Sequence, residues 1–349
     1  MLEMYNKWVN FVVEATRPPT PPTFVTENEV VLETNAFRLR RFSEGGDANP
    51  VLILPPQAGH HSGICDFSDE NSLVGVFLNN GIQSVYAMDW KSAAYGREGE
   101  SLETLILHTD RCISHIGGKV NLVGLCQGGW QAAMYTALFG YRVNCLVLAG
   151  APIDAHADPG KLKSACDVLP YSYFQTLVMA GGGIYRGEFQ LLAFKLMNSY
   201  DRFFGDYYKL YENMEDPVFL ERHHRFRNWY ETVSHLPGGW YLQIVDQLFI
   251  KNNLIKGKIT LFNKKVDLKN IECPLFLIAG TKDDITTPGQ VFNAGKYVAT
   301  PPERIERFLV DSGHIGLFMG RNSLTNAWPR VIEKMKTYCG QDQEFQEAL

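Results

Sequence analysis

A cysteine at position 126 lies in the sequence Gly124-Leu125-Cys126-Gln127-Gly128, directly after an apolar run and directly before a helical pattern. A nucleophile at such a strand-to-helix turn is presented at the end of the strand, and glycines two positions before and after it remove side chains that would collide there. The N-terminus of the following helix favours a thiolate. The pattern therefore predicts a cysteine nucleophile. The alternative is a structural cysteine buried beside a packing pair of glycines.

A nucleophile of this kind needs a histidine base later in the chain. Of the nine histidines, only His314 lies in a loop after the last predicted strand, and Gly313 and Gly316 flank it, as suits a loop at the top of a sheet. His314 is therefore predicted to take the proton of Cys126. The thiolate would attack an ester or thioester carbonyl and form an acyl-enzyme, which water or an alcohol resolves.

The residue that orients the base should be a carboxylate at the end of another strand. The apolar run 272–280 is followed by Asp283 and Asp284, and we prefer Asp284 because Asp283 is equally suited to be a solvated turn residue. Asp154, after the preceding strand, is the alternative acid. For each aspartate the competing interpretation is a turn former or a cap. Asp284 is thus expected to complete a catalytic triad.

Negative charge that develops on a substrate oxygen needs hydrogen-bond donors. The backbone N–H of Gln127, at the start of the predicted helix, is the expected first donor. A second donor usually comes from the loop after an earlier strand, here PPQAGHHSG at 55–63. A backbone N–H near Gln57 or Ala58 is the prediction.

Further side chains are expected to line the pocket: His60, His61, Trp90, Trp240 and Tyr241. The adjacent histidines suit the mouth of the site or local hydrogen bonds. No metal is predicted, because tandem histidines do not easily share one tetrahedral ion without further clustered ligands. No cofactor is predicted either.

The elements that must position these residues alternate regularly. Short apolar runs predict buried strands at 50–56, 82–90, 119–126, 142–152, 272–280 and 304–310. Helical spacing predicts helices at 71–81, 101–118, 127–140, 287–299 and 326–339, and a hairpin is predicted at 29–42. Strands that alternate with helices and are apolar on both faces indicate an α/β fold, with a mainly parallel central sheet covered by helices on both faces.

One segment interrupts this alternation. Residues 171–250 hold 19 of the 43 Phe, Trp and Tyr residues of the chain. We predict a helical cap, or lid, inserted at 161–260 into a core formed by 29–160 and 261–349, and preceded by a short helix and a proline-rich connector at 1–28. The competing interpretation is that these aromatic residues only make the core of a small helical domain.

The composition excludes several classes of protein. With 349 residues, 45% hydrophobic and 20% charged, the chain is of ordinary globular composition. The formal net charge of −5 argues against a nucleic-acid partner, and seven cysteines are too few for a disulfide framework. The N-terminal sequence lacks a signal-peptide pattern, and glycine, asparagine and glutamine interrupt the uncharged run 120–141. We therefore expect no transmembrane segment and a cytoplasmic location.

Several motifs together resemble the polyhydroxyalkanoate family, whose synthases and intracellular depolymerases share a cysteine-centred α/β-hydrolase fold. The stretches that carry the resemblance include PPQAGHHSG (55–63), GLCQGG (124–129), LAGAPIDAHADP (148–159) and SGHIGLFMGR (312–321). The resemblance spans residues 45–335. By motif match it implies that nucleophile, acid and base fall on Cys126, Asp284 and His314.

Most of these stretches resemble the depolymerase branch. This resemblance implies an intracellular hydrolase of poly-3-hydroxybutyrate-type polymer or hydroxyacyl oligomers, with association to polymer granules. The CQGG sequence resembles the synthases instead, especially the short type that works with a partner subunit. The alternative is therefore a synthase that transfers hydroxyacyl groups from CoA. A third hypothesis is a catalytically silent protein that binds the granule.

Overall fold

Eight strands form the central sheet, in the order β1-β2-β7-β3-β8-β9-β15-β16. The computed structural model describes residues 1–46 and 49–347, with side chains described as far as residue 338. From β7 to β16 all neighbouring strands are parallel, whereas β1 and β2 run antiparallel at one edge. The strands are β1 (Glu29–Glu33), β2 (Phe37–Arg41), β3 (Val51–Leu54), β7 (Val85–Trp90), β8 (Val120–Leu125), β9 (Val143–Ala149), β15 (Leu275–Gly280) and β16 (Ile305–Val310).

Helices cover both faces of this sheet, which explains why the central strands β3, β8 and β15 are buried at every position. In β3, Leu52 and Leu54 belong to an apolar cluster that includes residues of α3 (Leu102–Ile116) and α4 (Gln127–Phe139). Val51 and Ile53 belong to a second cluster with residues of α2 (Leu73–Asn79) and α13 (Trp328–Glu347). The predicted α/β class is confirmed, and the topology is that of the α/β-hydrolase fold.

Most predicted elements of the core are confirmed with small shifts at their ends. The helix predicted at 101–118 is α3, and the Ser101 side chain caps it by accepting a hydrogen bond from the Thr104 backbone N–H. The helix predicted at 287–299 is shorter: α11 (Pro288–Phe292) gives way to a 3₁₀ turn at Asn293–Lys296. Gly295 lies in this turn, and glycine weakens a helix interior.

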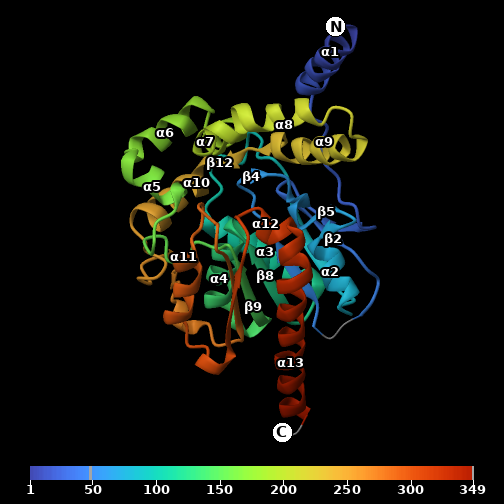
Figure 1. The fold of residues 1–349 in the computed structure, drawn as a ribbon. Helices are drawn as coiled ribbons and strands as arrows, with labels where there is room; N and C mark the ends of the chain where they lie inside the picture. The colour runs from blue at the N-terminus through green and yellow to red at the C-terminus, as the bar shows by residue number, and fades with distance from the viewer. Residues whose placement is uncertain (47–48, 348–349) are drawn as a thin grey trace.

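The chain between β9 and β15 forms a group of helices at one end of the molecule, above the sheet (Figure 1). The antiparallel pair of β10 (Ile184–Tyr185) with β12 (Leu236–Pro237) lies within this group, and the pair of β11 (Val233–Ser234) with β4 (Gly59–His60) joins the group to the loop after β3. The helices are α5 (Lys161–Val168), α6 (Tyr171–Ala180), α7 (Gly187–Met197), η3 (Asp201–Gly205), α8 (Asp206–Glu212), α9 (Pro217–Glu231), α10 (Gly238–Ile244) and η4 (Val245–Ile250).

The N-terminal helix α1 (Leu2–Thr16) contacts this group of helices rather than the sheet. Its Glu14 carboxylate lies 2.5 Å from Nε2 of His224 on α9, and the Arg227 side chain donates a hydrogen bond to the Glu14 carbonyl oxygen. The helix predicted at the N-terminus is therefore confirmed. Among the described residues, no helix is both long enough and apolar enough to cross a membrane.

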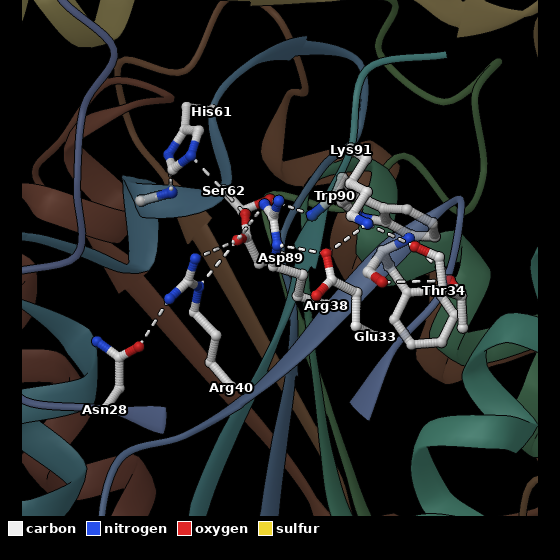
Figure 2. A network of polar contacts seen from close by, with 12 residues as sticks. Asn28, Glu33, Thr34, Arg38, Arg40, His61, Ser62, Asp89, Trp90 and Lys91 are labelled. Atoms are coloured by element: carbon white, nitrogen blue, oxygen red, sulfur yellow. Dashed lines mark hydrogen bonds and ion pairs between the residues drawn. The ribbon is translucent and has the colours of Figure 1, made fainter. Parts of the chain in front are cut away.

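A buried ion pair joins β2 to β7, and a network of polar contacts around it reaches the loop after β3 (Figure 2). Asp89, near the end of β7, is 1% exposed, and Nε and Nη2 of Arg40 both lie 2.8 Å from its Oδ2. Beside it, the Trp90 backbone N–H donates to Ser62 Oγ at 2.9 Å, and the Trp90 indole N–H donates to the Pro55 carbonyl at 3.0 Å. These contacts fix the loop that was expected to supply an oxyanion donor.

Replacing Arg40→Met should destabilise the protein and loosen this loop, because it removes the main partner of the buried Asp89 carboxylate. Breaking a fully buried pair costs about 3–5 kcal/mol. We expect a loss of about 3 kcal/mol, at the lower end of this range, because the Arg40 side chain is 21% exposed. Urea unfolding measures the loss, and hydrogen exchange of residues 55–63 measures the loosening.

Arg41→Met is the matched control for this variant. Arg41 pairs with Glu29 at 2.6 Å on the exposed edge of the sheet, where an ion pair contributes at most about 1 kcal/mol. Equal losses of stability in the two variants would contradict the importance of the Asp89 pair.

Candidate active site

Cys126 lies at the sharp turn between β8 and α4, as the sequence predicts. Its backbone has φ of 52° and ψ of −114°, and it occupies the N-cap position of α4. A positive φ is strained for a residue other than glycine and persists only where the surrounding structure enforces it. The Cys126 N–H donates to the Ala149 carbonyl of the neighbouring strand β9 at 2.8 Å. The strand-turn-helix context of the proposed nucleophile is therefore confirmed.

Close backbone packing enforces this turn. A Cβ atom on Gly124 would lie 2.5 Å from the Gly128 carbonyl oxygen. A Cβ on Gly128 would collide with the Leu54 carbonyl oxygen at the end of β3, and one on Gly129 would collide with the Ala151 side chain after β9. The glycines thus let the first turn of α4 sit directly against the ends of three strands.

His314, the predicted base, lies in the loop after β16. His314 Nδ1 is 2.7 Å from Asp283 Oδ2, and the two side chains are 10% and 0% exposed. The Phe318 ring packs edge-on against the imidazole at a centroid distance of 5.3 Å. Because the carboxylate accepts the proton of Nδ1, Nε2 is the nitrogen that remains for acid–base work toward Cys126.

The carboxylate at His314 belongs to Asp283, whereas we expected Asp284. Oδ1 of Asp283 accepts hydrogen bonds from the backbone N–H groups of Ile285 and Thr286, at 3.0 and 2.9 Å. This turn fixes the carboxylate so that its other oxygen faces His314. We expected Asp283 to be a turn residue, and for that reason preferred Asp284. Asp283 does form a turn, but the turn directs its carboxylate toward His314.

The two other aspartates have different partners. Asp284 is half-exposed and its carboxylate pairs with Lys161 Nζ at 2.5 Å, away from His314. The carboxylate of Asp154, the alternative acid, accepts hydrogen bonds from Asn252, Asn293 and Tyr297. Burial would raise the pKa of Asp154, but these hydrogen bonds hold the pKa below its ordinary value. Asp154 therefore joins separate segments of the chain, whereas Asp283 is the aspartate that bonds to His314.

Electrostatics favour a charged histidine in the site. Burial by itself would lower the pKa of His314. The charges of Asp283 and Cys126, together with hydrogen bonds to both, outweigh burial and raise the pKa of His314 well above its ordinary value. Imidazolium is thus the favoured form once Cys126 has lost its proton, and the N-terminus of α4 adds to the stabilisation of a thiolate.

The expected oxyanion donors lie beside the nucleophile, but one of them is occupied. Gln127 is the first residue of α4, so its backbone N–H has no acceptor within the helix. The Ala58 backbone N–H donates to Oε1 of the Gln127 side chain at 2.5 Å. The Gln57 side chain is 1% exposed, and its amide has no hydrogen-bond partner among the described residues.

A cavity of about 170 Å³ opens over Cys126, Gln127 and His314, and most of its lining side chains are apolar. Four of the five side chains expected in the pocket line this cavity: His60, His61, Trp240 and Tyr241. Trp90 does not line it, because its indole is buried beneath the loop after β3 and bonded to a backbone carbonyl.

The adjacent histidines face different surroundings. The His60 ring packs among Phe194, Trp229 and Tyr230, at centroid distances of 5.7, 4.6 and 4.6 Å. Burial lowers the pKa of His60 to about 3, so this ring is neutral in the cavity wall. His61 Nε2 lies 3.7 Å from Asp89 Oδ1 in the network of Figure 2. Among the described residues, no group of three or more His, Cys, Asp or Glu side chains is placed to hold a metal ion.

A further set of residues in the 161–260 segment also lines the cavity and was not anticipated. Its members recur every fourth residue: Gln190, Phe194, Asn198 and Arg202. Gln190 and Phe194 lie on α7, Asn198 is the C-cap residue that ends this helix, and Arg202 lies in η3. The same spacing is visible in the sequence, but the many aromatic residues of the segment hide it. The Arg202 guanidinium lies 4.8 Å from the centre of the Tyr230 ring and pairs with Asp206 at 2.9 Å.

The sheet order and the elbow between β8 and α4 place the protein in the α/β-hydrolase class. Solved structures agree: the chain is similar to a protein described as a lipase of Acinetobacter baumannii, with a TM-score of 0.51, 15% identity, and 89% and 92% of the two chains covered. An enol-lactonase of Burkholderia xenovorans superposes with a TM-score of 0.50, 14% identity, and 86% and 97% covered. At this identity the likeness shows the fold alone.

The chain belongs to the family described as "Protein of unknown function (DUF3141)", whose family model matches residues 42–303. It is also similar to proteins named "Poly(3-hydroxyalkanoate) polymerase subunit PhaC". That of Haloferax mediterranei is 29% identical over 88% of this chain, and the match spans 63% of its own length. That of Allochromatium vinosum is 25% identical over 88% of this chain and 85% of its own length. These names support the synthase alternative rather than the depolymerase interpretation.

The close packing at the elbow predicts that Gly128→Ala destabilises the protein, because the added methyl group must displace the end of β3. Overpacking of this kind typically costs about 1–3 kcal/mol. Thermal unfolding measures the loss. Gly99→Ala is the control, since a Cβ there meets no atom within 4 Å. An unchanged midpoint for Gly128→Ala would contradict the described packing.

Asp283→Asn should lower the pKa of His314 toward its ordinary value, because the charge that holds the proton is removed. We expect acyl transfer through Cys126 to slow by about 10² or more. Asp284→Asn should change neither quantity, since its carboxylate pairs with Lys161 and not with His314. Histidine titration by NMR and turnover of an activated ester test both expectations. A larger loss for Asp284→Asn would restore the original assignment.

Proposed function

We propose that this chain is a polyhydroxyalkanoate synthase, which transfers 3-hydroxyacyl groups from CoA to a growing polyester through Cys126. The observation that carries the proposal is a cysteine at the elbow, paired with His314 and Asp283 beneath an apolar cavity. The similarity to polymerase subunits over most of the chain supports the choice of substrate.

The first step exchanges one thioester for another. The Cys126 thiolate attacks the thioester carbonyl carbon, and the carbonyl oxygen takes up the negative charge in the tetrahedral intermediate. The intermediate collapses when its bond to the CoA sulfur breaks, and His314 returns the proton to that sulfur. Cys126 then carries the 3-hydroxyacyl group and CoA leaves as a thiol. A cysteine suits this exchange because the bond formed and the bond broken are of the same kind.

The second step forms the polymer bond. His314 takes the proton from the hydroxyl group at the end of a chain, and the resulting oxygen nucleophile attacks the acyl thioester on Cys126. Collapse of the new intermediate releases the Cys126 thiolate and leaves an ester. Asp283 orients His314 in both steps, and its charge stabilises the imidazolium each time it forms.

The surroundings of the cavity favour transfer over hydrolysis. Water that reached the acyl-enzyme would hydrolyse it, so an apolar lining protects the intermediate. We propose that the 161–260 segment acts as a cap, since its α7 and α10 contribute Phe194 and Trp240 to the cavity wall. Association with a granule surface and with a partner subunit remain predictions; the word "subunit" in the relatives' names supports the second.

The direction of the reaction decides between synthase and depolymerase. Purified protein is incubated with 3-hydroxybutyryl-CoA and, separately, with amorphous polymer granules. We expect release of CoA and growth of polymer in the first incubation, and little soluble 3-hydroxybutyrate in the second. Soluble acid from granules, without CoA release, would establish the depolymerase instead. Granule binding without either reaction would support the silent binding protein.

Cys126→Ala should abolish turnover in these incubations while the fold is retained. Cys273→Ala is the matched control, since this half-buried cysteine does not line the cavity over the elbow. Turnover that survives in the Cys126→Ala variant would remove the basis of the proposal.

A further inference from the structure

The Gln127 side chain has a fixed orientation next to the nucleophile. Its Oε1 lies 2.5 Å from the Ala58 backbone nitrogen, and a backbone N–H can only donate. The oxygen of the side-chain amide must therefore face Ala58, and the NH₂ group must occupy the other branch of the amide. The hydrogen bond thus determines which branch of the Gln127 amide carries the oxygen and which carries the nitrogen.

The NH₂ end of this side chain has no partner. Gln127 is 5% exposed, and its Nε2 is buried without a hydrogen bond to any described residue. The residue lines the cavity together with Cys126. A buried donor without an acceptor costs free energy, so it is an expected place for an acceptor atom of a ligand. In a cavity over a nucleophile, the arriving acceptor is the carbonyl oxygen of the acyl group.

We propose that Gln127 is a catalytic residue that supplies both oxyanion donors, its backbone N–H and its side-chain Nε2. This inference rests on acyl transfer through Cys126, as in the proposed function. Ala58 then acts as a positioning residue: its N–H holds Oε1 and polarises the amide, which strengthens Nε2 as a donor. The Ala58 N–H was expected to bind the oxyanion directly. In this arrangement it holds the Gln127 side chain instead, and Nε2 of that side chain binds the oxyanion.

The same contact allows an opposite outcome. If the Ala58 N–H itself binds the oxyanion, Oε1 of Gln127 blocks it and has to swing away before substrate reacts. Removing the side chain would then speed acylation rather than slow it. The two arrangements predict changes of opposite sign in the same variant.

The test follows acylation of the full-length protein by p-nitrophenyl butyrate, an activated ester that needs neither CoA nor polymer. We expect Gln127→Ala and Gln127→Met to slow the p-nitrophenol burst by about 10²–10³-fold, as the loss of one oxyanion donor does elsewhere, with little change in KM. Gln127→Glu keeps an acceptor for Ala58 but loses the donor and adds negative charge, so it should slow acylation at least as much.

Alkylation of Cys126 by iodoacetamide separates this role from a structural one. Alkylation needs the thiolate but develops no oxyanion, so it should proceed at the wild-type rate in Gln127→Ala and Gln127→Met. Gln131→Met is the matched control, because Gln131 is buried on the same helix but bonds to Thr109 outside the cavity. It should leave acylation unchanged.

Faster acylation in Gln127→Ala would overturn the proposal in favour of a blocking side chain. Unchanged acylation would also overturn it, as would an equal fall in acylation and alkylation, which indicates a damaged elbow. A wild-type protein that is alkylated at Cys126 but never acylated overturns it as well. Failure of the proposed function gives a different result. In that case p-nitrophenyl butyrate still acylates the protein, but 3-hydroxybutyryl-CoA releases no CoA.

Discussion

The close approach of α4 to the ends of β3, β8 and β9 is the constraint on which the site depends. Three glycines permit the contact, because a Cβ on any of them would meet backbone or side-chain atoms of a neighbour. The contact holds Cys126 at a positive φ, where its sulfur lies at the start of α4 and beside His314. Any change that moves α4 away from β3 would displace nucleophile and oxyanion donors together.

Features that depend on neighbouring residues in the chain were predictable. The alternation of strands and helices, the elbow and His314 follow from local patterns, since each needs only a few adjacent residues. The choice between Asp283 and Asp284 did not follow, because it depends on which carboxylate the turn through Ile285 and Thr286 aims inward. Trp90 was wrongly expected to line the pocket for a similar reason. Its indole donates a hydrogen bond to the Pro55 carbonyl, and no sequence pattern predicts this contact.

The wall of the cavity suits chemistry that must avoid water. Burial keeps His60 neutral among aromatic rings, so this residue adds no charge above the nucleophile. His314 and Asp283 form an ion pair beside Cys126, where the reaction moves protons, whereas Arg202 in the cavity wall is paired with Asp206. The network around Asp89 (Figure 2) reaches the loop that carries Ala58. Through its N–H, Ala58 in turn fixes the orientation of Gln127.

The most direct test of acyl transfer through Cys126 is mass spectrometry of protein quenched during reaction with 3-hydroxybutyryl-CoA. A single 3-hydroxybutyryl adduct is predicted on the peptide that contains Cys126, while the polyester chains in solution lengthen by whole hydroxyacyl units as incubation continues. The adduct should be lost on treatment with hydroxylamine, which cleaves thioesters. An adduct confined to another residue, or CoA release without any acyl group on Cys126, would contradict the account.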